Sequence, residues 1–302
     1  MSDFEQDKTK QFKYYRDTHL WPLADDFNFE EWLNNFAEGE ERDIAIRILD
    51  FFMFFPESLV NQMLATVIGK CGYYFKRKRG SWSDERFKTD CWYSFVPGEE
   101  LKPTDSGYLF QRKLRDNLHI PEKRIISYEQ LHQKLATTID QNVILVDDFV
   151  GSGHQTAVAW KLHSFYGGKT LEDWTITNNH CVTYAPLVVN YMGKMEIEDK
   201  CKNLDLTFIH ALSREFNIFS PDCPCWNGDR ALHRKAMHLL EVKSMALGIP
   251  FTGGSNIIDF MGYKQQGLAL AFYHCMPDAC PPIFYWETAN WKPLMNKVYP
   301  RP

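Results

Sequence analysis

Apolar residues over the first 80 positions recur at the three- to four-residue spacing of helices. A helix with Asn28 as its N-cap is predicted over 28–36. A second helix, ended by a proline, is predicted to carry the apolar residues of 44–55, and a third is predicted over 57–71. We therefore expect residues 1–80 to form an N-terminal helical region.

From residue 81 the pattern changes to short apolar runs that alternate with amphipathic stretches. This alternation predicts the α/β class, in which a parallel sheet is flanked by helices. We place the domain boundary at residue 80 and assign 81–302 to the α/β domain. The predicted strands are 91–96, 124–127, 143–146, 182–189, 206–210 and 268–273, and the predicted helices are 107–119, 129–138, 155–162 and 229–247.

The run from Val143 to Thr156 joins a predicted buried strand to a turn that suits an anion. Four apolar residues predict the strand, and Asp147 and Asp148 mark its carboxyl edge because carboxylates cannot stay buried without partners. The Gly-Ser-Gly turn over 151–153 can direct backbone amides at an anion, and the N-terminus of the helix from Gln155 faces the same place. An acidic pair beside an anion site suits a phosphorylated sugar.

Two adjacent acids after a strand can also hold a divalent metal or receive a phosphoryl group. The receiver domains of two-component pathways end an early strand in paired acids, but there the acids come near the start of the domain and no Gly-Ser-Gly turn follows. No nucleophile or general base is identified by the pattern. His154, beside the turn, is the best titratable candidate, and contact with the anion is its alternative role.

Composition adds one feature, because 22 Phe, 14 Tyr and 9 Trp in 302 residues imply bulky packing or an aromatic-lined cleft, with packing favoured. A net charge of −5 gives no general reason to expect nucleic-acid binding. One local run, Lys76, Arg77, Lys78 and Arg79, is interpreted as a solvated helix end, with contact to a phosphate backbone or an acidic partner as the alternative.

The first residues lack the layout of a secretory signal, and no apolar run approaches the ~20 residues that cross a bilayer. We expect a cytoplasmic protein without membrane contact, whose 8 cysteines are reduced. Cys223 and Cys225, with Cys275 and Cys280, come nearest to a zinc signature, but neither pair has the two-residue gap of a zinc knuckle. We therefore expect reduced cysteines without a metal, with a structural zinc site as the alternative.

The run from Val143 to Thr156 resembles the ribose-phosphate signature of type I phosphoribosyltransferases, with strand, two acids, small-residue turn and helix in order. The resemblance implies that Asp147 and Asp148 bind the ribose hydroxyls of phosphoribosyl pyrophosphate and act in catalysis, with Mg²⁺ held mainly through the ligand. It implies a 5-phosphate site at Gly151, Ser152, Gly153, His154, Gln155 and Thr156. By order along the chain, it places the pyrophosphate loop at 103–107, with Thr104, Asp105 and Ser106, of which Asp105 or Ser106 can instead cap the next helix.

A narrower resemblance covers nearly the full length. The helical N-terminal region with Trp21, Pro22 and Trp32, the form of residues 147–155 and the ending 277–294 are similar to phosphoribosyltransferase-like domains of bacterial conflict systems, including those accompanying retrons and other anti-phage modules. This resemblance implies an effector that acts on a phosphoribosyl compound or nucleotide, with partner proteins of a defence module bound through residues 1–80. An inactive sensor of a phosphoribosyl ligand, which regulates a partner, is the alternative.

Two departures from the type I phosphoribosyltransferases of nucleotide salvage, called salvage enzymes below, affect the expected activity. Gln155 occupies the position where those enzymes place a threonine, and Thr156 comes one step later. The long mobile loop that precedes their signature strand is replaced here by a predicted helix over 128–138. Without a lid, an oxocarbenium-like sugar is poorly protected from water, so hydrolysis or simple binding gains weight over transfer.

Overall fold

The computed structural model describes residues 3–23, 26–98 and 106–295. The chain divides into two compact units, which we describe separately. Unit 1 comprises residues 1–59 and 213–302, and unit 2 comprises residues 60–212. The boundary predicted at residue 80 therefore does not coincide with either division between the units.

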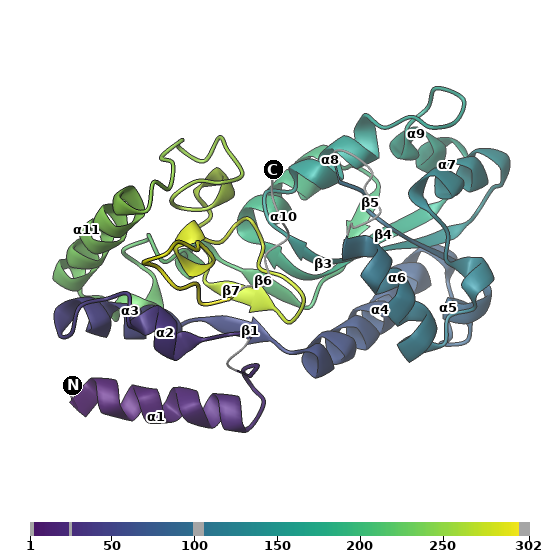
Figure 1. Ribbon diagram of the computed structural model, residues 1–302. Helices are drawn as coiled ribbons and strands as arrows, with labels where there is room; N and C mark the ends of the chain where they lie inside the picture. The colour runs from purple at the N-terminus through teal and green to yellow at the C-terminus, as the bar shows by residue number, and fades with distance from the viewer. Residues whose placement is uncertain (1–2, 24–25, 99–105, 296–302) are drawn as a thin grey trace. The chain divides into compact units, whose positions relative to one another are not determined.

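Unit 2 contains a five-stranded parallel sheet (Figure 1). The strand order is β2-β3-β4-β5, and β6 pairs with β4 beyond the point where β5 ends. All four pairings are parallel, which confirms the predicted α/β class. The strands are β2 (Cys91–Phe95), β3 (Asn142–Val150), β4 (Cys181–Asn190), β5 (Leu204–Leu206) and β6 (His210–Leu212).

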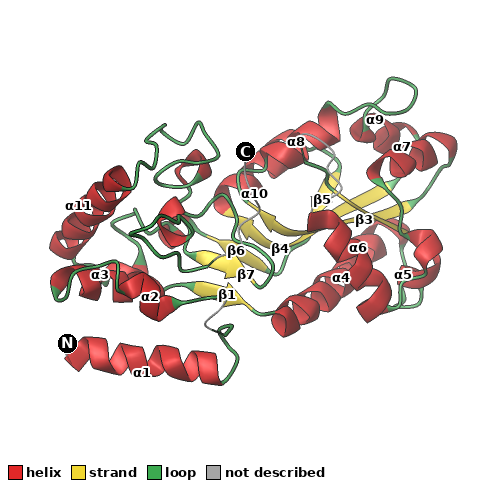
Figure 2. Cartoon of the chain, in the orientation of Figure 1, coloured by secondary structure: helices red, strands yellow, loops and turns green. Residues whose placement is uncertain are grey.

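Helices cover both faces of this sheet (Figure 2). One face packs in a single apolar cluster against α7 (Tyr128–Thr137), α8 (His154–Lys161), α9 (Leu171–Thr177) and α10 (Tyr191–Lys200). The opposite face carries α4 (Glu57–Arg79), and α6 (Ser106–Leu118) is tied to α4 by a Lys113–Asn61 hydrogen bond of 2.8 Å. The short α5 (Arg86–Thr89) and the 3-10 turn η1 (Glu122–Arg124) lie beside β2.

Unit 1 joins the two ends of the chain around a two-stranded parallel sheet. Its strands are β1 (Met53–Phe55) and β7 (Leu270–Phe272), paired in register from Met53↔Leu270. Aromatic side chains fill its core, including Phe12, Trp32 and Phe284. The helices are α1 (Asp3–Asp17), α2 (Phe29–Leu33), α3 (Glu40–Asp50) and α11 (Arg230–Ala246), with 3-10 turns η2 (Arg214–Phe216), η3 (Pro224–Trp226), η4 (Tyr263–Gln265) and η5 (Pro282–Phe284).

Four predicted elements differ from the structure. The strand predicted over 206–210 is replaced by two short strands, because β5 ends at Leu206 and β6 begins at His210. The second helix ends at Asp50. Residues 53–55 form a strand, because their backbone groups make hydrogen bonds with β7 in place of the hydrogen bonds of a helix. The strand predicted over 268–273 therefore belongs to unit 1 and not to the large sheet. The strand predicted over 124–127 is reduced to one bridge between Tyr93 and Ile125, because η1 precedes it and a helix cap follows it.

The first and third helices predicted in the N-terminal region are present in the structure. Asn28 caps α2 by accepting a hydrogen bond from the Glu31 amide, and α4 continues eight residues past the predicted end at residue 71 to Arg79. None of the helices in the described residues combines the length and apolar character that crossing a bilayer requires.

Candidate functional site

Strand β3 extends farther than its neighbour β2, and this difference opens the sheet at the two acids. The β2 pairing ends at Val146, whereas the β4 pairing continues to Val150. Asp147 and Asp148 therefore follow directly after β2 has ended, with a strand on one side only. This is the carboxyl edge of a parallel sheet, where ligands of such folds bind.

Asp147 is buried, with an exposed fraction of 8 %, and both of its oxygens accept hydrogen bonds. The Tyr184 hydroxyl of β4 donates to Oδ2 at 2.7 Å, and the Asp148 amide donates to Oδ1 at 2.9 Å. Burial, followed by the charge of Asp148, raises the pKa of Asp147 well above its usual value. The fold therefore favours the protonated form of Asp147, which can donate as well as accept a hydrogen bond.

Asp148 is also buried, and its Oδ1 accepts a 2.8 Å hydrogen bond from the amide of Phe149. Its carboxyl group interacts with that of Asp147 strongly enough to raise the pKa of Asp147 through both charge and hydrogen bonding. Two carboxyl groups this close do not both ionise readily. The pair thus offers one shared proton and several oxygen acceptors, a suitable set for a vicinal diol.

The turn after β3 leads into α8 through Gly153, whose φ of 75° lies in the left-handed region. Gly153 is the N-cap residue of α8 and has no side chain to cap it, and the Oγ of Ser152 accepts a long, 3.4 Å hydrogen bond from the His154 amide. The amides of the first turn of α8 have no acceptor within the helix. Together with the helix dipole they form an anion-binding end, which supports the predicted phosphate site.

Gly193, in α10, is a part of this site that the sequence analysis did not identify. A Cβ atom at Gly193 would lie 2.6 Å from the carbonyl oxygen of Gly151 and 2.6 Å from Cγ1 of Val150. A Cβ atom at Gly153 would in turn lie 2.8 Å from the carbonyl oxygen of Gly193. The turn over 151–153 therefore packs directly against the backbone of α10, and only a glycine at position 193 permits this close approach.

Gln155 and Thr156 hold the beginning of α8 to the two neighbouring strands. Gln155 Nε2 donates a 3.1 Å hydrogen bond to the carbonyl oxygen of Val96, directly after β2. Thr156 is buried and hydrogen-bonds the Tyr184 hydroxyl that also contacts Asp147. The side-chain amide of Gln155 is thus used in the framework, while Thr156 connects the phosphate turn to the acid pair.

The side chains predicted at the turn differ in exposure. Ser152 is half-buried, and its Oγ lies 3.4 Å from the amide of His154. His154 itself is exposed at the first position of α8. Its location permits contact with an anion at the helix end.

The predicted pyrophosphate loop falls mostly outside the described residues. Thr104 and Asp105 are not described, and Ser106 is the first residue of α6. Gly107 packs directly against the ring of Phe95. A Cβ atom at this position would lie 2.1 Å from the ring, so only a glycine fits. This contact brings the start of α6 to the end of β2, next to the open edge of β3.

Helix α7 occupies the place where salvage enzymes carry a mobile loop. Ser127 and Gln130 form a capping box at its start, and the Tyr128 hydroxyl donates a 2.6 Å hydrogen bond to the carbonyl oxygen of Ala159 in α8. Tyr128 is 1 % exposed. The prediction of a helix is confirmed, and its docking into the core makes α7 unsuitable as a lid.

The cysteines do not form the four-cysteine zinc site considered from the sequence. All eight are free and buried. The sulfurs of Cys223 and Cys225 lie 3.0 Å apart, and in the described part of the chain no third histidine, cysteine or acid joins them within 4.8 Å. Two sulfurs do not meet the four-ligand requirement of structural zinc.

The sequence matches one protein-family model and no curated protein. The model of the PRTase-CE family, a phosphoribosyltransferase-like family, matches residues 29–297. The match includes every residue of the site described above. A search of curated proteins gave no match.

Proposed function

We propose that this chain, which belongs to the PRTase-CE family, binds a phosphoribosyl compound or nucleotide at the carboxyl end of β3. The observation that carries the proposal is the buried acid pair beside a helix N-terminus whose N-cap residue is a glycine. In this arrangement Asp147 and Asp148 bind the ribose hydroxyls, and the turn over 151–153 with the first turn of α8 binds the 5-phosphate.

The residues of this site do not resemble a dedicated magnesium cage. Asp147 favours its protonated form, and its Oδ2 already accepts a hydrogen bond from the Tyr184 hydroxyl. It is therefore a weak ligand for a divalent cation. Mg²⁺ is therefore proposed to enter with the phosphates of the ligand, where it would neutralise a pyrophosphate leaving group. The protein contributes the diol contact, which strengthens as positive charge develops on the sugar ring.

The reaction class is proposed to be glycosyl transfer or hydrolysis. Since α7 is packed into the core, it does not serve as a mobile cover that excludes water from the site. The same observation favours a second function, a catalytically inactive sensor that binds the ligand and regulates a partner protein.

Isothermal calorimetry with phosphoribosyl pyrophosphate and Mg²⁺ tests what both functions share. Native protein is expected to bind, and Asp148→Asn is expected to lose at least about 10-fold in affinity, because a hydrogen bond to a charged group contributes ~1.5–3 kcal/mol. Equal binding by the two proteins, or none by either, would reject the site. Analysis of the incubated ligand then separates the functions: released pyrophosphate or base indicates the enzyme, and unchanged ligand the sensor.

A role as an effector of an anti-phage module, with partner proteins bound through residues 1–80, is part of the proposal and rests on the resemblance to domains of bacterial conflict systems. Deletion of the gene in a host that carries its natural neighbours tests it. Increased phage sensitivity on deletion, restored by the native gene but not by Asp148→Asn, is the expected result. Unchanged sensitivity would contradict a defence role without affecting the ligand site.

A further inference from the structure

The second half of α4 presents a basic and aromatic face that the site on β3 does not use. Lys70, Tyr73, Lys76 and Arg77 are exposed; the first three follow one another every three residues, and Arg77 comes four residues after Tyr73, so all four share one side of the helix. Tyr73 is 73 % exposed, which is unusual for a large ring. We call these four residues the α4 face.

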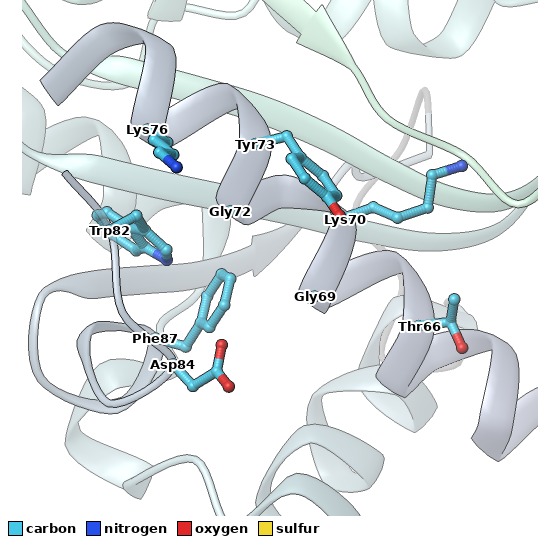
Figure 3. Close-up of a pocket in the computed structure, with 9 residues that line it drawn as sticks. All are labelled: Thr66, Gly69, Lys70, Gly72, Tyr73, Lys76, Trp82, Asp84 and Phe87. Carbon is cyan, nitrogen blue, oxygen red and sulfur yellow. The ribbon is translucent and has the colours of Figure 1, made fainter. Parts of the chain in front are cut away.

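A pocket of about 380 Å³ lies against this face (Figure 3). Its floor is helix backbone at Gly69 and Gly72, and Trp82 and Phe87 form its aromatic wall. A Cβ atom at Gly72 would lie 3.1 Å from Cδ1 of Trp82 and 3.2 Å from Cζ of Phe87, so the glycine lets the two rings approach the helix. The volume falls in the range of small-molecule sites and suits a nucleobase.

One side chain that lines the pocket has a hydrogen-bond donor without a partner. The indole Nε1 of Trp82 is shielded from solvent and has no acceptor in the described part of the chain. A buried donor without an acceptor costs about 1–3 kcal/mol, and the ring would have to move before a ligand in the pocket could accept from it. Asp84 at the rim is the one acid that lines the pocket.

Cations extend from the pocket along α4 and toward α10 in unit 2. Lys70 and Lys194 each lie 5.9 Å from the ring of Phe208, which brings α4 and α10 together at one end. On the α4 face itself, Lys70 and Lys76 are six residues apart, about 9 Å along the helix axis at 1.5 Å per residue. This length exceeds one nucleotide, so the row suits a chain of phosphates.

The acids near this row neutralise it only in part. Arg77 pairs with Asp205 at 3.4 Å, but Arg77 is 73 % exposed and such surface pairs contribute little. Lys194 pairs with Glu198 at 3.7 Å within α10. Lys76, which lines the pocket, forms no ion pair or hydrogen bond with any residue that the structure describes.

Arg79, the last residue of the basic run, has a different role. Its guanidinium donates to Asn142 Oδ1 at 3.0 Å, to the Gln141 carbonyl at 3.3 Å and to the Asn179 carbonyl at 3.2 Å. It therefore ties the end of α4 to the starts of β3 and β4. The basic run thus divides into three surface cations and one structural arginine.

We propose that the α4 face binds single-stranded nucleic acid. A base stacks on Tyr73 or enters the pocket beside Trp82, and the phosphates of neighbouring nucleotides contact Lys70 and Lys76. An exposed aromatic ring between cations is a feature of sequence-tolerant single-strand binding, whereas an acidic peptide would leave the ring of Tyr73 unused. This site is independent of the phosphoribosyl site on β3.

Fluorescence anisotropy with labelled oligothymidylate and oligouridylate of about 20 nucleotides tests the proposal on the full chain. Native protein is expected to bind, with affinity that falls as salt rises. Tyr73→Ala should weaken binding about 5- to 150-fold by loss of stacking, whereas Tyr73→Phe should bind like native protein. Binding of only one of the two oligonucleotides would support the proposal and identify the strand type.

The charge control compares two lysines of unit 2. Lys76→Glu should lower the affinity strongly and reduce the salt slope by about 0.7, whereas Lys123→Glu, an exposed residue on η1 outside the pocket, should have little effect. Asp148→Asn should bind oligonucleotide like native protein. No binding by native protein, equal losses at Lys76 and Lys123, or native affinity in Tyr73→Ala would each overturn the proposal.

Discussion

The interior of unit 1 is built from aromatic rings, whereas unit 2 buries polar side chains at the ends of its central strands. In unit 1, Trp32 is fully buried, its ring centroid lies 4.9 Å from that of Phe36 and 5.7 Å from that of Phe284, and its Nε1 donates to the Ile283 carbonyl. In unit 2, Asp147 and Asp148 are buried side by side.

The two kinds of burial have opposite effects on stability. Aromatic rings contribute large apolar areas, so they stabilise the fold wherever they pack well. Buried carboxyl groups cost free energy, because they lose hydration and interact unfavourably with each other. Since binding of a ligand can offset this cost, the contrast supports the proposal that the phosphoribosyl site lies in unit 2.

The largest expected effect is in the aromatic core. Trp32→Ala should lower the free energy of unfolding by about 3–5 kcal/mol, since it removes a fully buried ring and the hydrogen bond of its indole. Tyr14→Ala, at a ring that is 61 % exposed, should change it by less than about 0.5 kcal/mol. Urea unfolding followed by circular dichroism measures both, and equal values would contradict the role given to the unit 1 core.

A pair of helical glycines tests whether close packing of backbone supports the phosphate turn. Gly193→Ala should destabilise the protein by about 1–3 kcal/mol and weaken phosphoribosyl pyrophosphate binding, because the new methyl group collides with the Gly151 carbonyl. Gly69→Ala, with no atom within 4 Å of the added carbon, should stabilise it by about 0.4–1 kcal/mol. Thermal unfolding and calorimetry on both variants would show whether the two positions differ in this way.

The smallest expected effect is at the link between α8 and β2. Gln155→Ala should cost about 0.5–1.5 kcal/mol by removing the hydrogen bond to the Val96 carbonyl. Gln155→Glu, which keeps the length but brings two acceptors toward a carbonyl oxygen, should cost at least as much. If Gln155→Ala abolished ligand binding while stability stayed unchanged, Gln155 would be a ligand contact and not a part of the framework.

The central motif could be predicted because it is local in sequence. Strand, acids, turn and helix follow one another over 143–156, and their residue types alone indicate a strand edge beside an anion site. The contacts that complete the site come from elsewhere. Tyr184 and Gly193 reach the acids and the turn only through the β3–β4 pairing and the packing of α10, which no local pattern encodes.

The organisation of unit 1 could not be predicted for the same reason. Met53 to Phe55 continue an apolar run that fits a helix equally well, and their partner strand begins at Leu270. A pairing across more than 200 residues leaves no trace in local periodicity. Division of the chain at residue 80 followed from composition, whereas the compact units follow from this long-range pairing.

The central claim is that the acid pair is kept for a ligand at a cost in stability, and Asp147→Asn tests it most directly. The fold raises the pKa of Asp147, so the stability that this group contributes is complete below its unfolded value of about 3.9 and is lost as pH rises through the folded value. An amide carries no charge, and the Tyr184 hydroxyl can still pair with it.

Unfolding and phosphoribosyl pyrophosphate binding should be measured on native protein and Asp147→Asn from pH 4 to neutral pH. We expect similar stability at the acid end, a growing advantage of the variant as pH rises, and loss of ligand binding by the variant. A variant that is less stable than native protein at neutral pH, or one that binds the ligand equally well, would contradict the account.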